Sequence, residues 1–129
     1  MSPVESLTIV LPLLFLAGLF LLLAHWAEKG NLDRNSLIGI RTPATLQSDA
    51  AWEAGHQAAA PALRTWGWVE LMGAILVLVS ALLAPGSQLP AVVGLAFLFL
   101  PTLALVFTIT TKVSLAADQA HQAWEAQEK

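Results

Sequence analysis

The chain has no cysteine and few charged side chains. Because cysteine is absent, disulfide bonds, thiol catalysis and thiolate metal sites are excluded. Only 12% of the 129 residues are charged, whereas a soluble domain usually has about 25%. Hydrophobic residues make up 57% of the chain, which is more than a water-soluble protein of this size can bury. Intrinsic disorder is also excluded, since it requires low hydrophobicity and high net charge. We therefore interpret the chain as a membrane protein.

Long uncharged runs predict three transmembrane helices. The first, at about 6–27, is long enough to cross a hydrocarbon core of about 30 Å. No Lys or Arg precedes it, so it does not resemble a signal peptide and we expect it to be retained. The second run, from Leu71 to Thr111, would be roughly 60 Å long as one straight helix and must fold back. Two prolines and a glycine in residues 85–90 predict the turn. We expect helices at about 66–84 and 91–112.

The positions of the six Lys and Arg residues predict the orientation. None of them precedes the first helix or lies in the turn 85–90. All six lie between the first two helices or at the end of the third and beyond: Lys29, Arg34, Arg41, Arg64, Lys112 and Lys129. Because Lys and Arg accumulate on the cytoplasmic side of membranes, we expect the N-terminus outside the cell. Residues 28–65 and the tail 113–129 are then cytoplasmic. The tail is expected to be a helical extension that is solvated, with docking of a partner as the alternative.

The loop 28–65 is predicted to contain a helix of its own. Ser48 is a suitable N-cap, and Trp52 and His56 are four residues apart, so they share one helix face. Pro61 is expected to end or bend this helix before the second span. We interpret it as an amphipathic helix on the cytoplasmic leaflet, with Trp52 among the headgroups. The expected fold is a single all-α membrane domain, 1–129, with three transmembrane helices and this interfacial helix.

The same loop carries a motif, N-x-x-x-G-I-R-T-P-x-T-L-x-S-x-x-x-W-x-x-x-H, between an apolar span and a hairpin of spans. The arrangement resembles the SdpI family of bacterial membrane proteins. The resemblance implies a bacterial plasma-membrane protein without enzymatic activity. It also implies a protective role, since the founding members protect a bacterium against its own secreted antimicrobial peptide. This chain is shorter than the founding member and contains only the unit that carries the motif. The motif residues that form the candidate site are Asn35, Gly39, Arg41, Thr42, Pro43, Thr45, Trp52 and His56.

Arg41 is predicted to lie on a stiff turn. Gly39 adopts backbone conformations closed to other residues, whereas Pro43 fixes its own φ and favours an extended Thr42. A guanidinium held in this way can bind a carboxylate or a phosphate through two hydrogen bonds. Three alternatives stay open for Arg41: an ion pair that holds the loop, a lipid phosphate, or a specific ligand.

Glu70 is the one carboxyl group inside a predicted span, about 6 Å inward from Trp66. A carboxylate at that depth is costly unless it is paired, protonated or in contact with a wet cavity. We expect a polar cluster at the cytoplasmic mouth of the helices, formed by Glu70, His25, Thr108, Thr111 and Lys112 with Arg41 and His56 from the loop. One alternative is a structural knot, in which Glu70 pairs with Arg41, Arg64 or Lys112. The other is a small site, in which Glu70 and Arg41 recognise a ligand or headgroup.

Motifs for catalysis are missing from the sequence. There is no P-loop, dinucleotide fingerprint or nucleophile elbow, and the three histidines lack metal-ligand spacing. We therefore expect no enzymatic activity, no cofactor and no metal, and no nucleic-acid partner because no basic patch remains. The lipid bilayer is the one partner that the composition implies. Three functions stay open: resistance to an antimicrobial peptide, an accessory subunit of a larger membrane complex, and a lipid- or small-ligand-binding protein. The oligomeric state is not readable.

A reporter fusion tests the predicted orientation. We expect a reporter enzyme fused after Lys129 to be active only if its reaction takes place in the cytoplasm, because all Lys and Arg residues lie on that side. The same reporter inserted in the turn 85–90 is the matched control and should show the opposite behaviour. A C-terminal fusion that is active only outside the cell would contradict the orientation.

Overall fold

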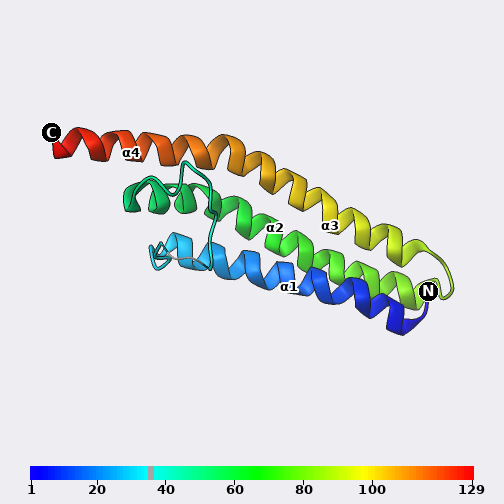
Figure 1. Cartoon of the computed structure of the whole chain (residues 1–129). Coiled ribbons are helices and arrows are strands. Elements are labelled where there is room, and N and C mark those ends of the chain that lie inside the picture. The colour runs from blue at the N-terminus through cyan, green and yellow to red at the C-terminus, as the bar shows by residue number, and fades with distance from the viewer. Residues whose placement is uncertain (35–36) are drawn as a thin grey trace. The chain divides into compact units, whose positions relative to one another are not determined.

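The computed structural model describes residues 1–34 and 37–129, and all regular secondary structure within them is helical (Figure 1). The elements are α1 (Pro3–Glu28), α2 (Asp49–Leu83), α3 (Leu89–Thr108), a π-helical turn η1 (Ile109–Val113) and α4 (Ser114–Glu128). Three helices are long and apolar enough to cross a membrane: Val4–Glu28, Asp49–Leu83 and the continuous helix Leu89–Glu128. The all-α class and the three apolar helices are therefore confirmed.

The helix expected between the first two spans is not a separate element. Helix α2 begins at Asp49 and continues through Pro61 to Leu83 without a break. Of the two predicted effects of Pro61, the one in which it ends the helix is therefore wrong. The Pro61 ring is exposed, and the alanines around it favour a helix. A helix of 35 residues is about 52 Å long, longer than a hydrocarbon core of about 30 Å. The N-terminal part of α2 therefore extends beyond the length needed to span a bilayer.

The third span also continues into the tail, through the π-helical turn η1. Hydroxyl groups near this turn bond backbone carbonyls of the preceding turns: Ser114 Oγ donates to Ile109 O (2.9 Å) and Thr111 Oγ1 donates to Phe107 O (2.7 Å). Such side-chain bonds compete with the regular helical pattern.

The turn predicted at 85–90 separates α2 from α3, and Gly86 adopts a φ of 81° within it.

The chain forms two compact units. Unit 1 consists of Met1–Leu21 and Thr65–Ala104, and unit 2 consists of Leu22–Arg64 and Leu105–Lys129. Helices α1, α2 and α3 each contribute residues to both units.

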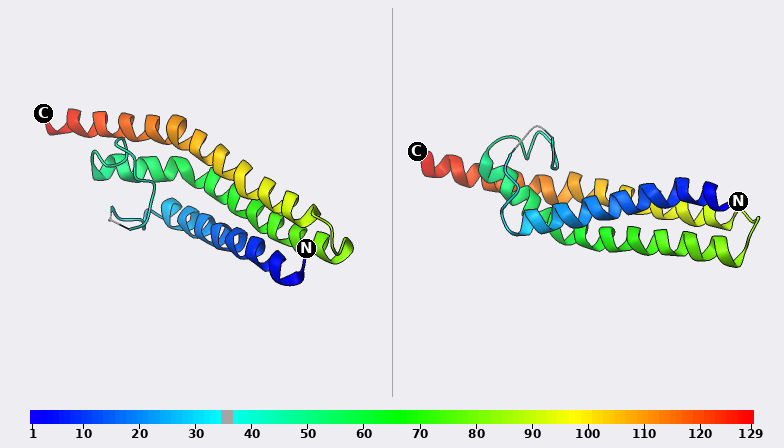
Figure 2. Two further views of the ribbon diagram at one scale, coloured as in Figure 1. Left: turned by 45° about the vertical axis from the view of Figure 1, so that its right-hand side comes forward. Right: turned by 90° about the horizontal axis from the view of Figure 1, so that it is seen from below.

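Unit 1 is a packed bundle of three helical segments, which run side by side in both views of Figure 2. Its core is formed by Val10 and Leu13 of α1 and by Ala74 and Val77 of α2, with Phe97 of α3 packed against them. Large apolar side chains also cover the outside of the segments; examples are Phe15, Leu82 and Phe99. An apolar exterior around an apolar core is the arrangement expected for helices surrounded by lipid.

The N-terminus lies beside the turn that joins α2 to α3. The amino group of Met1 donates a hydrogen bond to Ser87 O at 3.4 Å, and Figure 1 shows the two segments together. Both lie in unit 1, at the same end of its helices. This placement agrees with three successive crossings, which put the N-terminus and the turn on the same side of a membrane.

Candidate functional site

The motif adjoins the first turn of α2 in unit 2. Ser48 precedes the helix, and its Oγ accepts a hydrogen bond from the backbone N–H of Ala51 at 3.1 Å. The predicted N-cap is therefore confirmed, because this bond satisfies a backbone donor that has no partner within the helix.

The stiff turn predicted around Pro43 is built by two threonines. Thr45 Oγ1 accepts the backbone N–H of Thr42 (3.0 Å), and Thr42 Oγ1 accepts the backbone N–H of Thr45 (3.2 Å). The Thr45 hydroxyl also donates to Ile40 O at 2.7 Å and is fully buried. These reciprocal bonds fold the chain from Ile40 to Thr45 into a compact turn, with Arg41 and Pro43 exposed on it.

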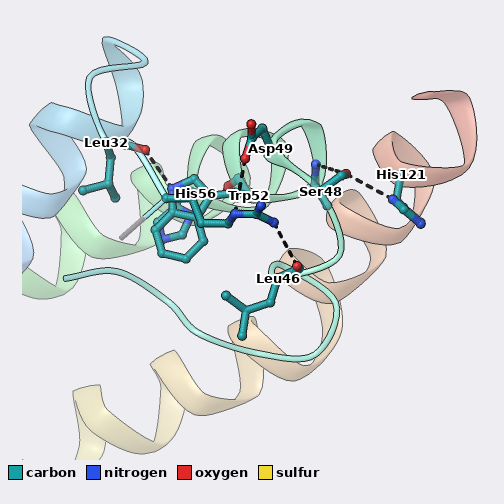
Figure 3. Close-up of polar contacts among 9 residues, drawn as sticks. Leu32, Leu46, Ser48, Asp49, Trp52, His56 and His121 are labelled. Carbon is teal, nitrogen blue, oxygen red and sulfur yellow. Dashed lines mark hydrogen bonds and ion pairs between the residues drawn. The ribbon is translucent and has the colours of Figure 1, made fainter. Parts of the chain in front are cut away.

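His56 joins this turn to α2. The backbone N–H of Ile40 donates to His56 Nε2 at 2.7 Å, and His56 Nδ1 lies 2.7 Å from Trp52 O (Figure 3 shows His56 beside Trp52). Because Nε2 accepts a hydrogen bond, it carries no hydrogen, so Nδ1 carries it and donates to the carbonyl. The geometry therefore requires a neutral imidazole in the Nδ1–H tautomer. Only 1% of the residue is exposed.

Trp52 is a core residue of unit 2. It is 2% exposed, its ring centroid lies 4.2 Å from that of His56, and its Nε1–H donates to Leu32 O at 2.7 Å (Figure 3). The expectation that Trp52 anchors a helix among lipid headgroups is therefore wrong. The indole N–H that would have met the headgroups bonds the start of the loop instead.

Gly39 crosses directly over the Trp52–His56 pair. Its φ is +129°, a conformation that other L-residues rarely adopt. A Cβ at this position would lie 2.6 Å from two carbons of the Trp52 ring and 2.9 Å from His56 Nε2. Both the backbone conformation and the lack of space require glycine here.

Helix α4 packs on the other side of the motif within unit 2. His121 Nδ1 lies 3.1 Å from Ser48 Oγ (Figure 3), and Gln47 Nε2 donates to Asp118 Oδ1 at 2.6 Å. The tail was expected to be a solvated helical extension, but its first turns contact the residues that precede α2. Sequence reasoning missed this contact; the available signal was the four-residue spacing of Val113 and Ala117, which both lie against Gly55.

Charged side chains lie at the surface of the folded motif. Arg34 Nε is 3.2 Å from Asp49 Oδ1, and Arg34 Nη1 donates to Leu46 O at 3.0 Å. Beside this pair is a cavity of about 290 Å³, whose lining includes Asp33 and Glu53. Exposed ion pairs contribute only about 0–1 kcal/mol each. The order of the loop therefore depends on its buried hydrogen bonds.

The structure brings together five of the motif residues that were predicted to form a site: Gly39, Thr42, Thr45, Trp52 and His56. Asn35 lies outside the described residues. The cluster predicted at the mouth of the helices contains residues of both units. Glu70 belongs to unit 1 and is fully buried. The members from the helices of unit 2 are more accessible: Thr108 is half-buried, and His25, Thr111 and Lys112 are exposed. Its convergence stays a prediction. Arg64, one of the cations considered for Glu70, forms an ion pair with Glu28.

Comparison with known proteins gives one family. The model of the SdpI/YfhL protein family matches residues 31–112, which include the whole motif, α2 and α3. No match was found among curated proteins or among solved structures.

Substitution of Gly39 tests the packing of the loop. Gly39→Ala should destabilise unit 2, because strained backbone costs about 1–3 kcal/mol and contact with the Trp52 ring adds about 1–3 kcal/mol. Gly86→Ala is the matched control, since Gly86 also has a positive φ but has nothing within 4 Å of an added Cβ. Limited proteolysis in detergent should cut residues 31–48 faster in Gly39→Ala only. Equal cleavage of the two variants would contradict the packing of Gly39 on Trp52.

Proposed function

Because the chain belongs to the SdpI/YfhL protein family, we propose that it is a non-enzymatic membrane protein that protects a bacterial cell against a secreted antimicrobial peptide. The observation that carries the proposal is the rigidly folded motif of unit 2. Its buried residues hold the loop, and Arg41 is exposed on its outer surface. A guanidinium carried on a backbone turn that is held by hydrogen bonds can recognise a carboxylate or phosphate.

The buried residues of the motif support a binding role rather than catalysis. Both ring nitrogens of His56 are engaged, one by Ile40 N–H and the other by Trp52 O. Neither is available to transfer a proton to or from a substrate. The Thr45 hydroxyl is likewise fully buried and bonded to the backbone.

The outer surface of the loop combines apolar and cationic side chains. Leu37 is 89% exposed, and Ile38 and Leu46 are also exposed on the segment that carries Arg41. Exposed apolar side chains on the same segment as an exposed cation are suited to an amphipathic peptide that carries a carboxylate. The peptide bound by this surface is, in the proposal, the one against which the protein protects.

The proposed location is the bacterial plasma membrane, with the N-terminus outside and unit 2 at the cytoplasmic face. The distribution of Lys and Arg supports this orientation. The peptide is then recognised at the cytoplasmic face of the membrane that it attacks.

A challenge with secreted antimicrobial peptides tests this function. Deletion of the gene should increase the sensitivity of the cell to at least one such peptide, and overexpression should decrease it. Arg41→Ala should reduce protection, because a charge-assisted hydrogen bond of about 1.5–3 kcal/mol corresponds to about tenfold to a hundredfold in affinity. Gly18→Ala is the control, since nothing lies within 4 Å of an added Cβ there.

The protein level in the membrane is measured for each variant, so that loss of protein is not read as loss of binding. If neither deletion nor overexpression changes sensitivity, the proposed function is wrong. If sensitivity to the peptides does not change and the chain always purifies together with the same larger complex, the accessory-subunit alternative is favoured instead.

A further inference from the structure

Glu70 is a fully buried carboxyl group within unit 1. It is 0% exposed, and neither of its oxygens has a hydrogen-bond partner among the described residues. Other buried polar side chains in those residues do have partners; Ser6 Oγ donates to Ser2 O and Ser80 Oγ to Val77 O. A buried polar atom without a partner is rare in folded proteins and calls for a physical explanation.

Close contacts between helices flank Glu70 on both sides. Gly67 and Gly73 lie three residues before and after it on α2, so all three share one helix face. A Cβ at Gly67 would lie 2.7 Å from Leu21 Cγ of α1, and a Cβ at Gly73 would lie 2.5 Å from Phe97 Cγ of α3. The carboxyl group therefore lies on the face of α2 against which α1 and α3 both pack.

No cation of unit 1 can neutralise Glu70. Residues 1–21 and 65–104 contain no Lys, Arg or His. Besides Glu70, the titratable groups of unit 1 are the amino group of Met1 and the carboxyl group of Glu5. Glu5 lies about 24 Å along α1 from Leu21. The α3 segment 89–104 has no titratable side chain, so the unit 1 segments of α1 and α3 present no cationic side chain to Glu70. The next titratable side chains along these helices, His25 and Glu28 of α1 and Lys112 beyond α3, belong to unit 2.

An ionised carboxylate is unstable in these surroundings. Its transfer from water to a protein interior costs several kcal/mol even after the protein relaxes, and the cost persists at membrane depth. A metal ion would need several oxygen ligands, and the described residues contain no group of three or more His, Asp or Glu that could hold one. A proton requires no further ligand.

We propose that Glu70 is a proton-binding site inside the helix bundle. The carboxyl group carries its proton while unit 1 is packed, and it gives the proton to a water molecule only when the surrounding helices separate enough to admit water. Proton binding at Glu70 is thereby linked to the packing of α1 and α3 against α2. This inference is independent of the proposed role in peptide resistance.

Infrared spectroscopy of the purified full chain in lipid bilayers tests the proposal. A protonated carboxylic acid has a C=O stretching band that a carboxylate lacks. The wild-type protein at neutral pH should show this band, and raising the pH should abolish it. Glu70→Gln should lack the band, whereas Glu5→Gln, which removes the other carboxyl side chain of unit 1, should retain it.

The wild-type spectrum alone is decisive if Glu70→Gln does not fold. Absence of the band at neutral pH would mean that Glu70 is ionised and paired, and would overturn the proposal. A band that disappears at high pH while α1 and α3 stay packed against α2 would also overturn it, since proton release would then not require the helices to separate. A band retained by folded Glu70→Gln would belong to another acid and would equally reject Glu70.

Discussion

The hydrogen bond from the backbone of Ile40 to the ring of His56 is the contact on which the folded loop depends. It joins the loop to α2 at a buried position. Because it fixes the tautomer of His56, it also directs the other ring nitrogen to Trp52 O. The Trp52 ring then forms the surface over which Gly39 passes, and the Thr45 hydroxyl secures the carbonyl of the same Ile40. These contacts share Ile40, Trp52 and His56, so they form one connected network between the loop and the start of α2.

His56 and Thr45 of unit 2 and Glu70 of unit 1 are all buried polar residues, but they differ in their hydrogen bonds. In unit 2, His56 and Thr45 are buried and bonded, so these residues are explained by the loop that they hold. In unit 1, Glu70 is equally buried but has no partner among the described residues. A satisfied polar group stabilises a fold, whereas an unsatisfied carboxyl group reduces stability, and it does so far more when it is ionised than when it is neutral. Residue type alone does not separate these roles; the hydrogen bonds do.

The apolar helices could be predicted from the sequence because the length of an uncharged run is a local property. The N-cap at Ser48 and the stiff turn around Pro43 could be predicted for the same reason. The continuity of α2 through Pro61 could not, because proline is a helix breaker in most contexts and only the surroundings decide.

The roles within the motif were harder to predict. Histidine, threonine and tryptophan provide the same donors and acceptors whether they bind a ligand or hold a loop, so the pattern marks a candidate site without separating the two uses. The tail contacts the residues that precede α2 through two pairs, Gln47 with Asp118 and Ser48 with His121. The members of these pairs are 71 and 73 positions apart in the sequence, which is too far for a local sequence pattern to indicate the contact. Glu70 was a recognisable candidate, but its lack of a partner needed the structure.

The most direct test of the central contact is nitrogen NMR of the protein with ¹⁵N-labelled histidine in lipid bilayers. A spectrum of His56→Gln assigns the signals that belong to His56. The account predicts a neutral ring at neutral pH, with the hydrogen on Nδ1 and an unprotonated Nε2 that accepts the hydrogen bond of Ile40. A hydrogen on Nε2, in either the other neutral tautomer or the imidazolium, would contradict it.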